Sequence, residues 1–190
     1  RGTDLSAEVA EVFDLGGKGK NCFDLYYEGI VNLSDFPPDI LPNSQGIQVE
    51  CAITKSTIVN YEKVMAFLAT LWHPLYFLDF ETFMQAIPPY DGTRPYQQIP
   101  FQYSLHSIAR EGAPLEHREF LAEPNTDPRA EIARRLAGEI PEHACVIAYS
   151  SNFEARILGE LADQFLEHRE KLRLIMGNLR DLAIPFRSRD

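Results

Sequence analysis

The stretch Tyr76–Thr82 constrains the fold of this chain most, because bulky, strand-favouring residues there are interrupted by two carboxylates. Side chains alternate between faces along a β-strand, so Asp79 and Glu81 point to one face while their apolar neighbours point to the other. Two acids on one face of an apolar strand are costly to bury unless a partner compensates their charge. Hard divalent cations such as Mg²⁺ take carboxylate oxygens as ligands. The stretch therefore predicts either a metal-binding strand or an exposed strand edge with two solvated acids.

The composition describes one good-sized domain, or a domain with a substantial extra segment. With 190 residues, 45% hydrophobic and 11% aromatic, the chain can bury a core, which excludes global disorder. Its three cysteines form no Cys-x-x-Cys pair, which argues against a zinc motif and a disulfide framework and predicts a cytoplasmic protein. No apolar run approaches the roughly 20 residues of a membrane span, and no signal peptide is visible, so we expect no membrane partner.

The net charge of −10 is unfavourable for a protein that grips phosphates. Its distribution matters more than its sum, because 10 of the 18 lysine and arginine residues fall within residues 127–190. Any contact with nucleic acid is therefore expected to depend on this last third, although mixed charges on a helix are more often solvated.

Residues 1–72 have the pattern of a helical lead-in that follows an upstream domain. Apolar spacing and capping residues predict helices over Ser6–Phe13, Cys22–Ile30 and Tyr61–Leu71. The glycine cluster Gly16–Lys20 lacks the spacing of a phosphate-binding loop and is interpreted as a flexible loop.

From residue 73 the pattern changes to that of an α/β domain with a mixed sheet. Three strands are expected as a meander, followed by a helix, a buried strand, a second helix and a short last strand. Their ranges are Tyr76–Thr82, Phe101–Ala109, Glu116–Leu121, Asp127 to about Ala137, Cys145–Tyr149, Asn152–Phe165 and, near the end, Leu179–Ile184. In the second strand Gln102, Ser104 and His106 are expected on one face, opposite the apolar residues.

This order, with an acidic first strand, resembles the ribonuclease-H-like fold and, within it, the DEDD-type 3′–5′ exonucleases. Their first motif is Asp-x-Glu on the first strand, which Leu78–Thr82 matches. Their second motif joins the fourth strand to the next helix, where this chain has Tyr149–Glu154. Two departures are Ser150 in place of the usual Asn and Glu154 in place of the usual Asp.

The chain is also similar to an uncharacterised bacterial domain family in which such a module follows a RecB-like nuclease domain. The similarity rests on Pro74–Thr82, Pro100–His106, Phe153–Glu154 and Glu160–Ala162. It implies a nucleic-acid substrate, DNA or RNA with a single-stranded end, and a RecB-like domain upstream in the same chain.

The resemblance implies a site that binds Mg²⁺ or Mn²⁺, in which Asp79 bridges two ions and Glu81 and Glu154 each hold one. Two such ions about 3.5–4 Å apart can support phosphodiester hydrolysis. A late motif, Tyr-x-x-x-Asp or His-x-x-x-x-Asp, normally adds a fourth acid and a base, but this sequence has neither pattern. The motif is therefore expected beyond residue 190, with Asp181 as a partial substitute.

Six further residues are candidates for substrate binding: Thr82, Gln102, His106, Tyr149, Ser150 and Arg156. Three of them also have ordinary structural interpretations: His106 as a hydrogen-bonded strand residue, Arg156 as a solvent-facing helix residue and Tyr149 as a residue that packs by the site. The sequence thus predicts a metal-dependent 3′–5′ exonuclease module, or alternatively a catalytically silent module that binds nucleic acid or a partner domain.

Overall fold

The structure is a computed structural model that describes residues 22–36 and 43–187. The chain divides into two compact units, one formed by residues 1–61 with 187–190 and the other by residues 62–186. The expected functional division at residues 72 and 73 stays a prediction. The helix Ser6–Phe13 and the loop Gly16–Lys20 lie outside the described residues.

The first unit is a small helical assembly. Its elements are α1 (Cys22–Tyr27), the 3-10 helix η3 (Leu33–Asp35) and α2 (Asn43–Thr54). A core of four buried residues holds them together: Leu25, Leu33, Phe36 and Val49. The sequence did not predict α2, because its residues show little helical segregation of apolar from polar side chains.

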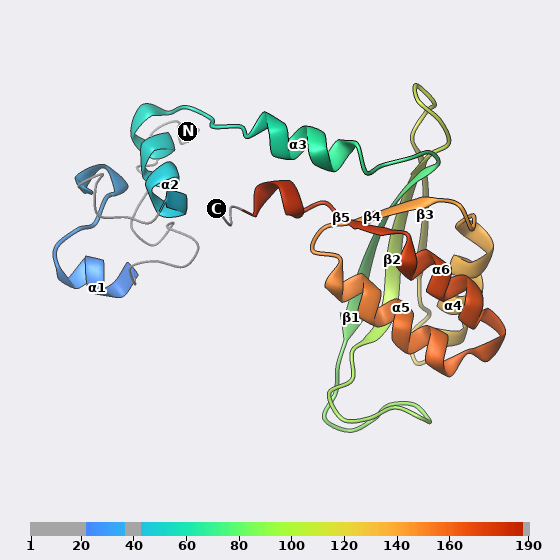
Figure 1. Cartoon of the computed structure of the whole chain (residues 1–190). Coiled ribbons are helices and arrows are strands. Elements are labelled where there is room, and N and C mark those ends of the chain that lie inside the picture. The colour runs from blue at the N-terminus through green and yellow to red at the C-terminus, as the bar shows by residue number, and fades with distance from the viewer. Residues whose placement is uncertain (1–21, 37–42, 188–190) are drawn as a thin grey trace, which may run out of the picture. The chain divides into compact units, whose positions relative to one another are not determined.

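The second unit is a five-stranded mixed sheet with helices (Figure 1). Its elements are α3 (Tyr61–Leu68), β1 (Leu75–Phe83), β2 (Ile99–Ile108), β3 (Glu116–Leu121), α4 (Arg129–Glu139), β4 (Cys145–Ala148), α5 (Asn152–Gln164), η5 (Leu166–His168), α6 (Arg169–Gly177), β5 (Leu179–Asp181) and η6 (Ile184–Phe186). The strand order is β3-β2-β1-β4-β5, with the first three strands antiparallel and β4 and β5 parallel to β1. This confirms the predicted α/β class and mixed sheet.

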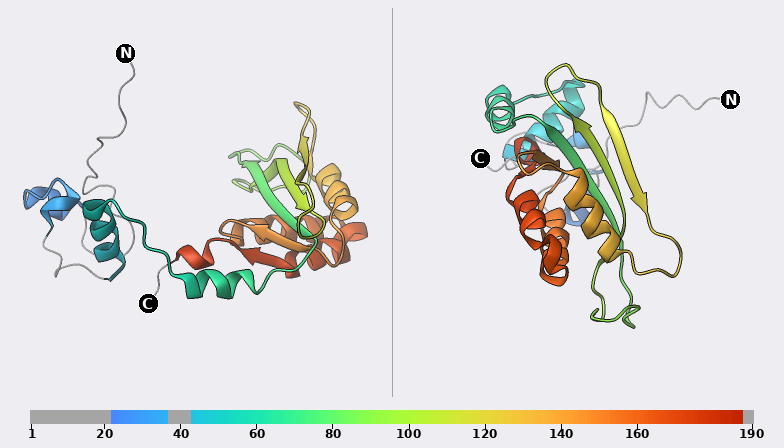
Figure 2. Two further views of the ribbon diagram at one scale, coloured as in Figure 1. Left: turned by 90° about the horizontal axis from the view of Figure 1, so that it is seen from above. Right: turned by 90° about the vertical axis from the view of Figure 1, so that its right-hand side faces the viewer.

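Alternation along β1 separates a buried face from an exposed one. Tyr76, Leu78 and Phe80 are buried in the core, whereas Asp79 and Glu81 are exposed. The helices α4, α5 and α6 supply the rest of this core and lie on the same side of the sheet (Figure 2). The opposite face carries the polar residues of β2. The sheet therefore presents Asp79 and Glu81 away from its helix-covered face.

The pairing of β1 with β2 is interrupted near their ends. Glu81 pairs with Gln102 but Thr82 pairs with Pro100, so Phe101 is passed over and forms a bulge. Because of this shift, Phe83 pairs with Ile99 and lies against the Phe101 ring.

The structure corrects several predicted boundaries and adds one helix. The helix α6 was missed, because its first half is mostly charged and only two of its positions, Leu172 and Ile175, are buried. The last strand ends at Asp181 rather than Ile184, since the N–H of Ala183 is donated to the Asp181 carboxylate instead of continuing a ladder. The helix α4 begins at Arg129, whose N–H is accepted by the Asp127 carboxylate.

Candidate active site

The turn between β4 and α5 places the second candidate motif beside β5. After the fully buried strand β4, the chain turns at Ser150, whose φ of 62° is a left-handed conformation unusual for a residue other than glycine. The Ser150 N–H donates a 2.8 Å hydrogen bond to Oδ1 of Asp181, so β5 fixes the turn. The helix α5 then begins, and Glu154 lies in its first turn.

Glu154 is a buried carboxylate with unsatisfied hydrogen-bonding capacity. Its side chain is only 3% exposed, and its Oε2 is the only buried side-chain polar atom in the described part of the chain without a hydrogen-bond partner. Burial raises the pKa of Glu154, its own backbone N–H opposes this, and the negative charges of Asp79 and Asp181 raise the pKa further. The negative charges of Asp79 on β1 and Asp181 on β5 therefore both act on Glu154 in the first turn of α5.

The three acids differ in their surroundings. Asp79 is exposed on β1, whereas Asp181 is buried, and its Oδ1 accepts the N–H groups of Ser150 at 2.8 Å and Ala183 at 2.9 Å. These bonds give Asp181 a structural role, since they connect β5 to the β4–α5 turn. Asp79 is thus exposed, Asp181 has its hydrogen-bonding capacity met by backbone N–H groups, and Glu154 has one oxygen without a hydrogen-bond partner.

Glu81 shares the exposed face of β1 with Asp79 but lies two residues nearer the end of the strand, opposite Gln102. In this structure Asp181, rather than Glu81, joins Asp79 in acting on the charge of Glu154. Within residues 22–36 and 43–187, no three His, Cys, Asp or Glu side chains are gathered closely enough to hold a metal ion.

The candidate substrate-binding residues separate into three places: a contact at Gln98, the open face of the sheet, and the β4–α5 turn with Tyr149 and Ser150. Thr82 and Arg156 meet at Gln98, whose Nε2 donates to Thr82 Oγ1 at 3.4 Å and whose Oε1 accepts from Arg156. The guanidinium carbon of Arg156 also lies over the Phe153 ring, 5.4 Å from the ring centroid.

The second place is the open face of the sheet. There the His106 ring stacks on His117 with centroids 4.2 Å apart, and Gln102 lies on the same strand face as His106. His117 in turn contacts the Ser104 hydroxyl at 3.2 Å. Tyr149, in the β4–α5 turn, is 69% exposed.

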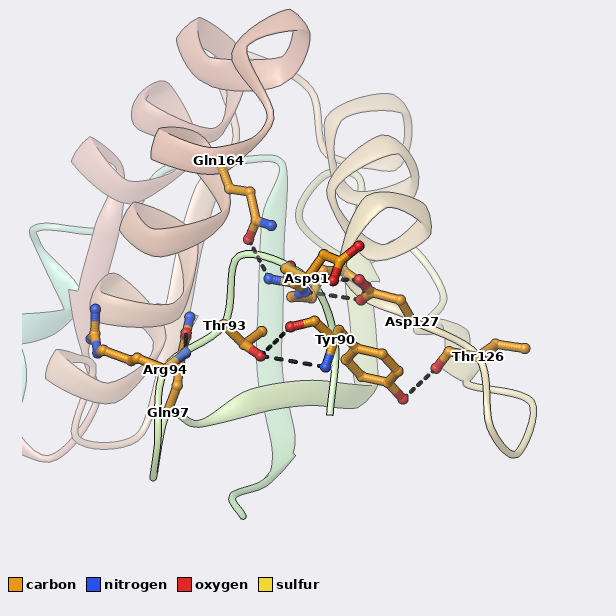
Figure 3. A network of polar contacts seen from close by, with 9 residues as sticks. Tyr90, Asp91, Thr93, Arg94, Gln97, Thr126, Asp127 and Gln164 are labelled. Carbon is orange, nitrogen blue, oxygen red and sulfur yellow. Dashed lines mark hydrogen bonds and ion pairs between the residues drawn. The ribbon is translucent and has the colours of Figure 1, made fainter. Parts of the chain in front are cut away.

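The sequence did not single out the residues of the β1–β2 loop that connect it to the helices. Gln97 Nε2 donates to Glu160 Oε2 at 2.9 Å, and Arg94 forms an ion pair with the same carboxylate. Arg94 and Gln97 lie side by side in the loop (Figure 3). The sequence pattern did not predict these contacts, because the Pro and Gly residues of this segment indicated only a loop. These contacts bring the loop to the side of α5 that carries Arg156.

The fold and site together define a mixed α/β domain in which carboxylates of β1 and β5 act electrostatically on a buried carboxylate of α5. Residues 76–189 match the family described as a domain of unknown function, DUF2779, and the chain belongs to this family. No curated protein and no solved structure shows a significant match to the chain. None of the helices in the described part of the chain has the length and apolar character that a bilayer crossing requires.

Proposed function

We propose that this chain is a metal-dependent nuclease module of ribonuclease-H-like type, most similar to 3′–5′ exonucleases that hydrolyse phosphodiester bonds of DNA or RNA. The observation that carries the proposal is Glu154, a buried carboxylate with an unsatisfied oxygen, on which the negative charges of Asp79 and Asp181 act. An unpartnered buried carboxylate is costly, and a bound cation would remove that cost. The meander β1–β3, followed by the helix-linked parallel strand β4, supports the same fold.

The residues present fit Mg²⁺ or Mn²⁺ in chemistry, since all are oxygen donors from carboxylates. Asp79 and Glu154 would hold the cation, and Glu81, on the same strand as Asp79, would be a further ligand. Asp181 would be a partial substitute for the fourth acid. When bound, the cation supplies Lewis acidity toward a phosphodiester and activation of a water.

The chain's own residues would position the nucleic-acid strand. Arg156, on the exposed side of α5, would contact a phosphate, with Thr82 held near it through Gln98. Tyr149, exposed in the β4–α5 turn five residues before Glu154, would contact the terminal nucleotide. A RecB-like domain in the same chain and a cytoplasmic location remain part of the proposal.

Metal-linked stability tests this function directly. A cation that binds only the folded state raises the melting temperature, by roughly 2–4 °C for each kcal/mol in a chain of this size. Millimolar Mn²⁺ should therefore stabilise the wild type, and Asp79→Asn should remove most of the gain. Glu119→Gln is the matched control, because Glu119 is exposed on the same face, one strand beyond Ser104. Equal responses of Asp79→Asn and wild type would refute the metal site.

A catalytically silent module is the second candidate, and one observation favours it. Asp181 is already engaged by two backbone N–H groups, so its carboxylate has a sufficient structural reason to be there. Labelled single strands separate the two candidates: the nuclease shortens them with Mn²⁺ in an Asp79-dependent way, whereas the silent module only binds them.

A further inference from the structure

A cavity in the second unit lies beyond the end of β1, apart from the acidic residues of the candidate active site. It has a volume of about 640 Å³ and is bounded by the end of β1, the start of β2, the β1–β2 loop and the segment that follows β3. Three aromatic rings form its walls: Phe83, Tyr90 and Phe101. The ring of Phe83 lies between the other two, with centroids 6.5 Å from Tyr90 and 6.2 Å from Phe101.

The cavity wall is held in place by polar contacts from two loops. The Tyr90 hydroxyl donates a 2.6 Å hydrogen bond to the carbonyl oxygen of Thr126, which joins the β1–β2 loop to the segment before α4 (Figure 3). The guanidinium of Arg129 lies 5.8 Å from the centroid of the Tyr90 ring and donates to the carbonyl of Asp91 at 2.9 Å. The aromatic wall is therefore formed before any ligand arrives.

The chemistry of the wall selects an uncharged, flat ligand. None of the residues that line the cavity is Lys or Arg, and one, Glu123, is a carboxylate, so a phosphate would be repelled. Side-chain amides of Gln85 and Asn125 supply donors and acceptors beside the aromatic rings. Aromatic side chains stack on the π-faces of bases, and amides hydrogen-bond to base edges.

We propose that this cavity, which we call the base pocket, binds an unpaired nucleobase of the strand whose end lies at the acidic residues. This inference rests on the proposed nuclease function. Phe83 follows Asp79 by four residues on β1, a separation of about 13 Å at roughly 3.3 Å per residue. At about 3.4 Å per stacked nucleotide, this corresponds to about four nucleotides from the strand end.

The test measures affinity against strand length in EDTA, with labelled oligodeoxyadenylates of two to eight nucleotides. Affinity should rise about 5- to 100-fold when the strand exceeds about four nucleotides, because one stacked base is added. Phe83→Leu should abolish this rise and leave dinucleotide binding unchanged. Tyr96→Leu, an exposed aromatic of the same loop, is the matched control and should retain the rise.

A second variant tests the base pocket even if Phe83→Leu fails to fold. Asn125 has a φ of 62°, so Asn125→Gly preserves the backbone while removing the amide. It should reduce the affinity of long adenylate strands several-fold and leave short ones unaffected.

The outcomes distinguish the two proposals. Hydrolysis with Mn²⁺ but no length dependence would refute the base pocket and leave the nuclease standing. Length-dependent binding without hydrolysis would support the base pocket and refute the nuclease. Binding of a proline-rich peptide, which also favours aromatic grooves, with no binding of any strand would overturn the base pocket.

Discussion

Two charged side chains, Arg129 and Glu154, are each only 3% exposed, yet their surroundings are opposite. Arg129 is surrounded by acceptors: both carboxylate oxygens of Asp127 at 2.9 and 2.6 Å, Gln164 Oε1 at 2.7 Å and the Asp91 carbonyl at 2.9 Å. Glu154 has an oxygen with no partner and two negative charges nearby.

The difference separates a charge with a structural role from one that the proposed function would use. Arg129 connects the β1–β2 loop to α4 and α5, and each of its contacts supports the fold. Glu154 opposes the stability of the metal-free protein, since burying a charge without compensation is unfavourable. Under the proposed function, a cation-bound state would use the carboxylate that costs stability in the metal-free state.

The largest effect is expected from Arg129→Met. Removal of the guanidinium leaves Asp127 and Gln164 without their partner and should lower the free energy of unfolding by about 2–4 kcal/mol, less than for a fully buried pair because Asp127 is partly exposed. Urea denaturation measures it. Arg134→Met is the control: Arg134 is 61% exposed and pairs only within its helix, so its loss should cost much less than that of Arg129. Similar losses in both variants would remove the contrast on which the comparison rests.

Glu154→Gln should change stability in the opposite direction. The neutral amide is nearly isosteric and is not repelled by Asp79 and Asp181, so the metal-free free energy of unfolding should rise by about 1–2 kcal/mol at pH 7. The same variant should lose the stabilisation by Mn²⁺. Glu167→Gln, at an exposed position, should behave as wild type in both measurements. A destabilised Glu154→Gln would show that this carboxylate is structural, like Arg129.

Acid titration should sharpen the contrast further. Burial raises the pKa of Asp127, but the hydrogen bonds and charge of Arg129 outweigh this and hold the pKa below its ordinary value of 3.8. A carboxylate whose pKa is lower in the folded than in the unfolded state stabilises the folded protein at pH values above its unfolded-state pKa. This stabilisation is lost as the pH falls through the folded-state pKa. Below about pH 4 the wild type should therefore lose stability faster than Asp127→Asn, by less than about 1 kcal/mol because the pair is partly exposed.

The free energy of unfolding of wild type must be compared with that of Asp127→Asn at each pH, since Glu131 also titrates. Its hydrogen bonds with Arg134 and Arg135 lower its pKa to about 2, so it adds to the acid slope of both proteins equally. Parallel pH curves for wild type and Asp127→Asn would contradict the role assigned to the Arg129 contact.

Tyr90→Phe should give the smallest effect. It removes only the hydrogen bond to the Thr126 carbonyl, an exposed contact, and keeps the ring that Arg129 and Phe83 contact. We expect a loss of about 0.5 kcal/mol in urea denaturation, with strand binding at the base pocket retained. A loss above about 2 kcal/mol would mean that this bond, rather than Arg129, holds the loop.

Local pattern was enough to predict most strands of the sheet. Alternation in Tyr76–Phe80 predicted which side of β1 is buried, and the bounds of β3 agree with the predicted ones. Long-range information was needed elsewhere: the bulge at Phe101 depends on how two strands pair, which neither strand encodes alone. The acidic site shows the same limit, because Asp181 meets Glu154 only after β5 pairs with β4. The buried contacts of Arg129 could not be predicted either, since nothing local places Asp91 and Gln164 beside it.

The two-faced strand β1 also sets how this family can vary in length. Deletion of one residue between Tyr76 and Asp79 would exchange the faces, so that Asp79 would enter the core in place of Leu78. Substitutions there alter one side chain, but a frame-preserving gain or loss of a codon would invert the whole strand. Family members should therefore keep β1 at constant length and place their insertions in residues 84–98 or 109–115, where the chain is free of the sheet ladder.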